Sequence, residues 1–103
     1  MHTPLYEIRC TAGRGNRLYV KRDDLLPFSL GGNKVRIGWE FYRDMRRTGS
    51  DCMVIYGDSR SNLCRVLGNI CCQEQIPCYM LCTNVDGSAR PSSNSRLMTW
   101  LQT

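Results

Sequence analysis

The chain has 103 residues, with 14 basic and 9 acidic side chains, a formal net charge of +5 and a hydrophobic fraction of 42%. This length suits one domain and is too short for two, and the hydrophobic fraction is that of a globular chain. No apolar run approaches the roughly 20 residues that cross a bilayer, and the N-terminal MHTPLYEIRC lacks a signal pattern. We therefore expect a cytoplasmic protein with no membrane partner.

The basic residues are spread along the whole chain. They form no run of five or more, and no basic stripe alternates with aromatic residues. Such a distribution is typical of a solvated surface, whereas a nucleic-acid site gathers its positive charge in one footprint. We expect no nucleic-acid partner, and a basic nucleic-acid-binding module is the least favoured function.

The seven cysteines stand at positions 10, 52, 64, 71, 72, 78 and 82. No two of them have C-x-x-C spacing, and His2 is the one histidine, so we expect no metal site. The cysteines at 52, 71, 78 and 82 lie inside apolar stretches. Small buried thiols in a reducing compartment explain them better than a disulfide framework does.

The first half of the chain contains one predicted strand and one predicted helix. The β-prone LYVK at 18–21 predicts a short strand, and the residues at 25–32 predict a loop. Apolar residues then recur at helical spacing over 33–47, and Gly49 is expected to end this helix. The main apolar stripe of the helix holds Val35, Trp39, Tyr42 and Met45.

The second half repeats this alternation. A continuous apolar run at 52–56 predicts a buried strand, and a polar turn follows at 57–62. A second helix is expected to run to about residue 75, then a strand at 78–82 and a short helix at 95–101. Alternating strands and helices indicate βαβ units. The predicted fold class is therefore a three-layer α/β unit, a parallel sheet with helices on its faces.

Lys34 is the most distinctive candidate for chemistry. Ligands of open parallel sheets bind beyond the carboxyl ends of the strands, and Lys34 follows a Gly31-Gly32 turn at the start of the first helix. It is either a solvated lysine, slightly disfavoured there by the helix dipole, or a partly desolvated amine that reacts with a carbonyl group. The residue alone does not separate these two interpretations.

Ser61 and Asn62 open the second predicted helix. Serine and asparagine are common helix caps, so capping is the favoured interpretation of both residues. A capping residue can still present its hydroxyl or amide group to a ligand. A helix N-terminus also attracts anions, which makes this turn the second candidate for a binding site.

Short motifs along the chain resemble a known enzyme family. They occur in the order seen in pyridoxal-phosphate (PLP) enzymes of the tryptophan synthase β-like fold, known as fold type II: TPL at 3–5, YVKRDD at 19–24, GGNKVR at 31–36, GDSRSNLCR at 57–65 and NSRLM at 94–98. The resemblance is closest to the branch holding 1-aminocyclopropane-1-carboxylate (ACC) deaminase and D-cysteine desulfhydrase. It covers almost the whole chain.

The resemblance implies roles for the candidate residues. Lys34 matches the lysine that bonds covalently to PLP in this family. Ser61 matches the serine that lies near the substrate carboxylate or acts as a nucleophile in ring opening. Asn62 matches the asparagine that bonds the ring oxygen of the cofactor. The implied activity is deamination or desulfhydration of a small amino acid.

Family members are much longer, and their phosphate-binding loop lies downstream of the motifs matched here. The resemblance therefore implies that 1–103 is a single, incomplete N-terminal part of such an enzyme, inactive alone. The alternative is a truncated, non-catalytic paralogue that binds or regulates a partner. The apolar residues of the last predicted helix favour homo-oligomers or another association through that helix.

Overall fold

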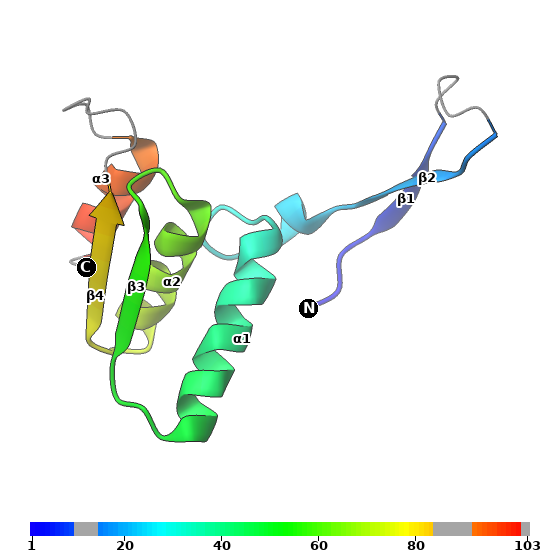
Figure 1. Ribbon diagram of the computed structural model, residues 1–103. Helices are drawn as coiled ribbons and strands as arrows, with labels where there is room; N and C mark the ends of the chain where they lie inside the picture. Colours follow the sequence, from blue (N-terminus) through cyan, green and yellow to red (C-terminus); the bar gives the residue numbers. More distant parts are fainter. Residues whose placement is uncertain (10–14, 84–91, 102–103) are drawn as a thin grey trace.

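The computed structural model describes residues 1–9, 15–83 and 92–101. In Figure 1 three helices pack with one small sheet, and the N-terminal segment projects from them. The elements in chain order are the strands β1 (Leu5–Ile8) and β2 (Leu18–Lys21), a 3₁₀ turn at Asp23–Leu25, helix α1 (Asn33–Thr48), strand β3 (Met53–Asp58), helix α2 (Asn62–Gln73), strand β4 (Cys78–Thr83) and helix α3 (Ser93–Trp100).

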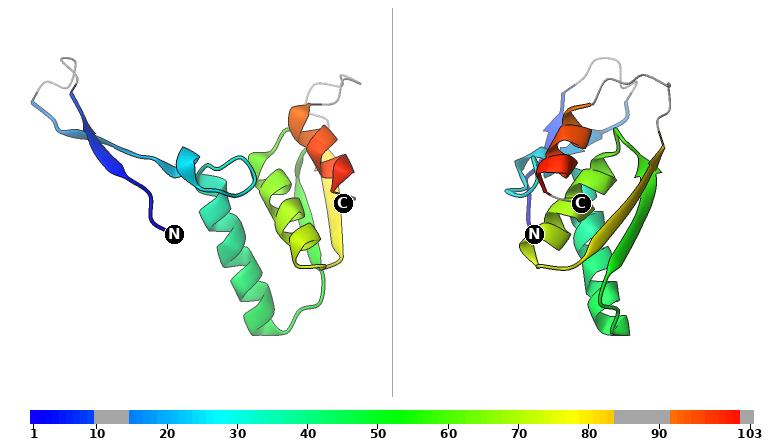
Figure 2. Two further views of the ribbon diagram at one scale, coloured as in Figure 1. Left: turned by 180° about the vertical axis from the view of Figure 1, so that it is seen from behind. Right: turned by 90° about the vertical axis from the view of Figure 1, so that its left-hand side faces the viewer.

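Strands β1 and β2 form an antiparallel pair, in a register that runs from Leu5 opposite Lys21 to Ile8 opposite Leu18. All residues of both strands are exposed. The pair projects away from the helices in Figure 1 and in the left view of Figure 2. It extends the molecule, whose radius of gyration is 16.7 Å, against about 13 Å for a compact chain of this length.

The prediction that 18–21 joins the parallel sheet is wrong. The sheets are separate: β2 pairs with β1 in one, and β3 pairs with β4 in the other. No strand is predicted at 5–8, although this segment supplies the nearer partner. A hairpin partner needs only a short connection, whereas parallel pairing needs a long crossover.

Strands β3 and β4 pair in parallel, as predicted, from Met53 opposite Cys78 to Asp58 opposite Thr83. With α2 between them they form one βαβ unit. The described helices lie on one side of this sheet (Figure 2), so the part described has two layers where three were predicted. The outer face of the sheet is apolar and 58–77% exposed, through Val54, Tyr56, Tyr79 and Leu81.

Helix α2 is the centre of the packing, because it lies between two apolar clusters. The first joins it to α1 and to the segment before α1, through Leu26, Val35, Val66 and Ile70. The second joins it to the sheet and to α3, through Ile55, Cys64, Leu67 and Met98. Burial on both sides fixes α2, and therefore its N-terminus, relative to the other elements.

Helix α1 buries the predicted stripe. Val35 and Met45 are buried, and Trp39 and Tyr42 pack partly buried against the first cluster. Gly38 brings the helix close to α2: a Cβ at this position would lie 2.7 Å from Cγ1 of Val66. Gly49 ends the helix in the left-handed conformation, with φ of 74°, as its sequence position predicts.

The cysteines divide into buried and exposed groups. Cys64 and Cys71 are buried and Cys78 is half-buried, whereas Cys52 and Cys82 are exposed. The prediction of burial is therefore wrong for Cys52, which precedes β3, and for Cys82, near the open end of β4. Cys10 lies outside the described residues. No helix of the described part is long and apolar enough to cross a membrane.

Candidate functional site

The turn before α1 has an unusual backbone. Ser29, Leu30, Gly31 and Gly32 all have positive φ, from 47° to 96°. A backbone hydrogen bond joins this turn to the preceding 3₁₀ turn, because the Gly32 N–H donates to the Asp23 carbonyl at 2.7 Å. A Cβ on Gly31 would lie 2.5 Å from the Asp24 carbonyl oxygen. The turn therefore needs glycine at 31 for two reasons, its left-handed backbone and the absence of space.

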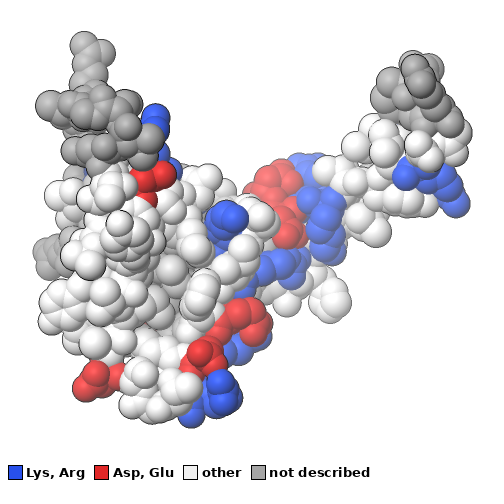
Figure 3. Space-filling view, viewed as in Figure 1, with Lys and Arg blue, Asp and Glu red and all other residues white. Residues whose placement is uncertain are grey.

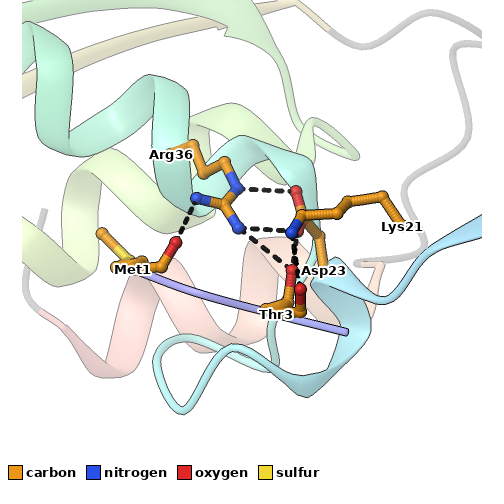
Figure 4. Close-up of polar contacts among 5 residues, drawn as sticks. All are labelled: Met1, Thr3, Lys21, Asp23 and Arg36. Atoms are coloured by element: carbon orange, nitrogen blue, oxygen red, sulfur yellow. Dashed lines mark hydrogen bonds and ion pairs between the residues drawn. The ribbon is translucent and has the colours of Figure 1, made fainter. Parts of the chain in front are cut away.

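A polar cluster fixes the start of α1 (Figure 4). Arg36 donates to both carboxylate oxygens of Asp23, at 2.8 and 2.9 Å. Thr3 donates to the same carboxylate at 2.7 Å. The hydrogen bonds from Arg36 and then Thr3 lower the pKa of Asp23 to about 2. Arg36 also donates to the Met1 carbonyl at 2.7 Å, so the N-terminus, the 3₁₀ turn and α1 are tied together.

Lys34 lies on the first turn of α1 and is half-buried. The N-cap residue of α1 is Gly32, so no side chain caps the first turn of this helix. Within residues 1–9, 15–83 and 92–101, the Lys34 amine makes no hydrogen bond or ion pair, whereas the Lys21 amine donates to the Thr3 carbonyl at 2.5 Å. Of the two lysines, Lys34 thus has the amine that is not already engaged.

Ser61 is the N-cap of α2, as predicted. Its Oγ accepts the Cys64 N–H at 3.1 Å. This bond uses the hydroxyl oxygen as an acceptor and leaves the hydroxyl hydrogen to be donated elsewhere. The capping interpretation is confirmed for Ser61, where it is compatible with a ligand at the same hydroxyl. It is wrong for Asn62, which is the first residue of the helix and not its cap.

Arg65 connects the two candidate turns. It is 8% exposed and its Nη2 donates to the Ser29 carbonyl at 3.0 Å, in the turn that precedes Lys34. Its Nη1 donates at 2.8 Å to Oδ1 of Asn62 and at 2.8 Å to Oδ1 of Asn94. The loop before α1 and the N-termini of α2 and α3 therefore meet at one guanidinium group.

All three helices begin at the end of the sheet where β3 and β4 finish (Figure 1). The structure therefore brings Ser61 and Asn62 together and places Lys34 at the same end. No described contact joins Lys34 directly to Ser61 or Asn62; the connection runs through Ser29 and Arg65. This is the end at which open parallel sheets bind ligands.

Asp23, Arg65 and Asn94 have no role predicted from the sequence. A signal was available for Arg65, which stands in the predominantly apolar LCRVLGNI. A charged residue inside such a run is buried only when its hydrogen-bonding groups are satisfied. Asp23 and Arg36 lie inside the quoted motifs, but nothing in their spacing shows that they pair.

Hollows lie both away from this end of the sheet and beside it. One of about 360 Å³ is bounded by the second half of α1 and by β3. Another of about 320 Å³ lies between Leu30, Asn69 and the end of α3, beside Arg65. On the face shown in Figure 3, acidic and basic side chains are interspersed, and the described ion pairs include Arg22–Asp24, Arg43–Glu40 and Arg47–Asp44.

The chain is similar to D-cysteine desulfhydrases. It is 34% identical over 89 residues to that protein of Yersinia enterocolitica, which is 85% of this chain and 27% of the relative. It is 34% identical over 87 residues to the Yersinia pestis protein and 33% over 87 residues to that of Salmonella paratyphi B, each covering 84% of this chain. The comparison confirms the desulfhydrase resemblance that the motifs indicated.

The chain spans about a quarter of the length of the curated relatives it matches, 27% and 26% in the cases above. No protein-family model matches it. The similarity therefore covers most of this chain but only one part of each related enzyme.

Proposed function

We propose that this chain is the N-terminal part of a PLP-dependent deaminase or desulfhydrase that acts on a small amino acid of the ACC or D-cysteine type. One observation supports this more than any other: Lys34, Ser61 and Asn62 lie at the same end of one βαβ unit, in an arrangement held by Arg65. The similarity to D-cysteine desulfhydrases supports the same reaction class. The tryptophan synthase β-like layering belongs to this proposal, since a βαβ unit is compatible with it.

The residues present fit the aldehyde half of PLP. Lys34 offers an amine that no described residue engages. Asn62 offers an amide whose oxygen is occupied by two donors, so its hydrogens face outward. PLP supplies, when bound, the electron sink for breaking bonds at the amino-acid Cα.

The chain's own residues supply binding and proton transfer. Lys34 would provide a nucleophilic amine toward the cofactor's aldehyde and a base at Nζ. The N-termini of α1 and α2 direct backbone N–H groups toward this end of the sheet, which favours the carboxylate of an amino-acid substrate. Ser61 retains its hydroxyl hydrogen for donation to that carboxylate. The Gly31-Gly32 turn holds Lys34 in place while these groups act.

The test is reductive trapping. The purified chain is incubated with PLP, treated with borohydride and mapped by peptide mass spectrometry. Label is expected on Lys34 in preference to Lys21, whose amine is hydrogen-bonded to Thr3. Labelling is expected to be weak and reversible before reduction, because the family's phosphate loop is not among these residues.

Lys34→Arg is expected to abolish specific labelling, Lys21→Arg to leave it unchanged, and Ser61→Ala to leave it intact. The two lysine variants keep the charge, so they are matched controls for each other. Equal labelling of both lysines would make Lys34 an ordinary surface amine and would overturn the proposal.

A second candidate function is that of a non-catalytic partner, and the uncovered apolar face of β3 and β4 favours it. Such a face is a typical interaction surface. The chain would then associate with a full-length desulfhydrase. Size-exclusion chromatography of the two proteins mixed tests this: co-elution without Lys34 labelling supports the partner function, and separate elution with Lys34 labelling supports the enzymatic one.

A further inference from the structure

Arg65 is a buried cation that the described residues pair with no acid. Its four described hydrogen bonds go to the hydroxyl and carbonyl oxygens of Ser29, to Oδ1 of Asn62 and to Oδ1 of Asn94. Burial lowers the pKa of its guanidinium group, although an arginine remains protonated in proteins. Arg65 therefore acts on its neighbours only as a donor.

This donor-only character fixes the orientation of two amide groups. Each asparagine must turn its oxygen toward Arg65, because its NH₂ group would meet another donor. Asn94 then donates its Nδ2 to the Arg60 carbonyl at 2.7 Å and to Oδ1 of Asn62 at 2.9 Å. Every bond in this network agrees with one assignment of both amides.

This assignment determines which way the Asn62 amide faces. Its Oδ1 accepts from Arg65 and from Asn94, which uses both acceptor positions of the oxygen. Its Nδ2 has no acceptor among residues 1–9, 15–83 and 92–101, and Asn62 is exposed. The amide therefore presents two hydrogens outward from the start of α2.

We propose that Arg65 and Asn94 are positioning residues that hold the Asn62 amide with Nδ2 outward, as a fixed donor for an anionic oxygen of the ligand. The inference rests on the proposed function for the identity of that oxygen, which is the ring oxygen of PLP. A donor held in advance loses no freedom when the ligand binds, and this strengthens binding.

A purely structural role makes a different prediction. Arg65 also ties Ser29 to α2 and α3, so its loss would weaken the fold whether or not it orients Asn62. The test therefore needs a readout at the Asn62 amide itself. Two variants serve: Arg65→Lys keeps a buried donor-only cation, and Asn94→Asp keeps an acceptor for Arg65 but removes the donor to Asn62. Asn69→Asp makes the same charge change on α2, at a residue without a described bond to Arg65, Asn62 or Asn94.

The measurement is ¹⁵N relaxation of the Asn62 side-chain amide in the full chain, with the resonance assigned by its loss in Asn62→Asp. Far-ultraviolet circular dichroism confirms that each variant is folded. In the wild-type chain and in Asn69→Asp the amide is expected to be nearly as ordered as the backbone. In Arg65→Lys and Asn94→Asp its order parameter is expected to fall. An order parameter that does not change in either folded variant overturns the proposal, with or without PLP.

Titration with PLP adds the ligand. Asn62 resonances are expected to shift in the wild-type chain, and the PLP dissociation constant to rise about three- to tenfold in Arg65→Lys and Asn94→Asp, as for the loss of one hydrogen bond. Less than a twofold change is expected in Asn69→Asp. If PLP labels Lys34 but these variants bind it as the wild type does, positioning fails and the proposed function stands. If the amide is ordered as expected but PLP does not bind, the proposed function fails and the positioning stands.

Discussion

Arg36 and Asp23 form a two-point ion pair, with Nε and Nη2 of Arg36 at 2.8 and 2.9 Å from the two Asp23 carboxylate oxygens. The pair closes the segment that contains the Gly31-Gly32 turn, because Asp23 lies before that turn and Arg36 lies after Lys34. Both side chains are more than half-buried, 33% exposed for Arg36 and 15% for Asp23. The position of Lys34 therefore depends on a contact that Lys34 does not make.

Asp23→Asn is expected to lower the melting temperature of the chain, since it removes the acceptor charge for Arg36. The pKa of Asp23 is about 2 in the folded chain and about 3.9 in an unfolded one. The contribution of Asp23 to stability is thus present above about pH 4 and is lost as the pH falls from about 4 to about 2. Thermal unfolding followed by circular dichroism over this range is expected to show less acid destabilisation in Asp23→Asn.

Asp24→Asn is the control for that variant. Asp24 also accepts two hydrogen bonds, from Arg22, but this pair joins residues two apart and the Asp24 side chain is 60% exposed. Its loss is expected to lower the melting temperature less. Equal effects of the two substitutions would show that the Arg36 pair has no special part in holding the turn.

Gly31→Ala is expected to be more destabilising than Gly32→Ala. Both residues have positive φ, so each alanine costs about 1–2 kcal/mol in backbone strain. Only at Gly31 does the new Cβ also meet backbone, at 2.5 Å from the Asp24 carbonyl oxygen, whereas nothing lies within 4 Å of a Cβ at Gly32. Urea unfolding of the two variants measures the difference, and similar midpoints would contradict the close contact.

Gly38→Ala is expected to destabilise the chain although alanine is the better helix former. A Cβ at 38 would lie 2.7 Å from Val66 Cγ1 and 3.0 Å from Ile70 Cδ1. Overpacking of this kind costs about 1–3 kcal/mol, against about 1 kcal/mol gained from helix propensity. Val66→Ala is expected to relieve part of the cost, so the double variant should be less destabilised than the sum of the two single ones. Strict additivity would contradict the contact between α1 and α2.

The outer face of β3 and β4 is expected to bind an apolar dye and to drive association. Val54, Tyr56, Tyr79 and Leu81 expose 58–77% of their surface there. Val54→Lys with Leu81→Lys is expected to reduce both dye fluorescence and the mean size measured by light scattering. Thr99→Lys, at an exposed position on α3, adds charge elsewhere and is expected to change neither. A monodisperse wild-type monomer that binds no dye would show that this face has no such tendency.

Thiol labelling of the folded chain is expected to follow burial and ionisation together. Cys64 and Cys71 are at most 2% exposed and should react with a maleimide only as fast as the chain opens. Cys82 is exposed, but desolvation raises the pKa of its thiol, so less of it is thiolate at pH 7. Cys72 is exposed as well, and mass spectrometry at early times should find label on Cys72 before Cys82. The reverse order would contradict the raised pKa.

The helices and the parallel pair could be predicted because each is set by local pattern. The apolar stripe of α1 and the glycine that ends it are read directly from the sequence, and the continuous apolar run at 52–56 indicates a strand. The predicted burial of that strand is wrong for its outer face, where Val54 and Tyr56 are exposed. The partner of β2 could not be predicted in this way. Its pairing with Leu5–Ile8 depends on a hairpin connection, and the pattern of 18–21 is the same for either kind of sheet.

The candidate site was predictable only where residues carry chemistry by themselves. The sequence places polar turns before two predicted helices, and Lys34, Ser61 and Asn62 stand beside those turns. Arg65 and Asn94 are 29 positions apart, and they meet because α3 packs back on α2 through Met98. That contact is tertiary, so no local pattern reports it.

The central place of α2 has a consequence for how the chain opens. Because α1 covers one side of this helix and the sheet and α3 cover the other, its backbone amides become accessible only when both clusters separate. Amide hydrogen exchange in α2 should therefore report the global unfolding reaction. Among the described residues, those of β1 and β2 belong to neither apolar cluster, so this strand pair should exchange first. The candidate site lies between the parts expected to exchange slowly and quickly. Asn62 stands on α2, where exchange should be slowest, and Lys34 stands on α1, which Arg36 joins to Asp23 just after β2.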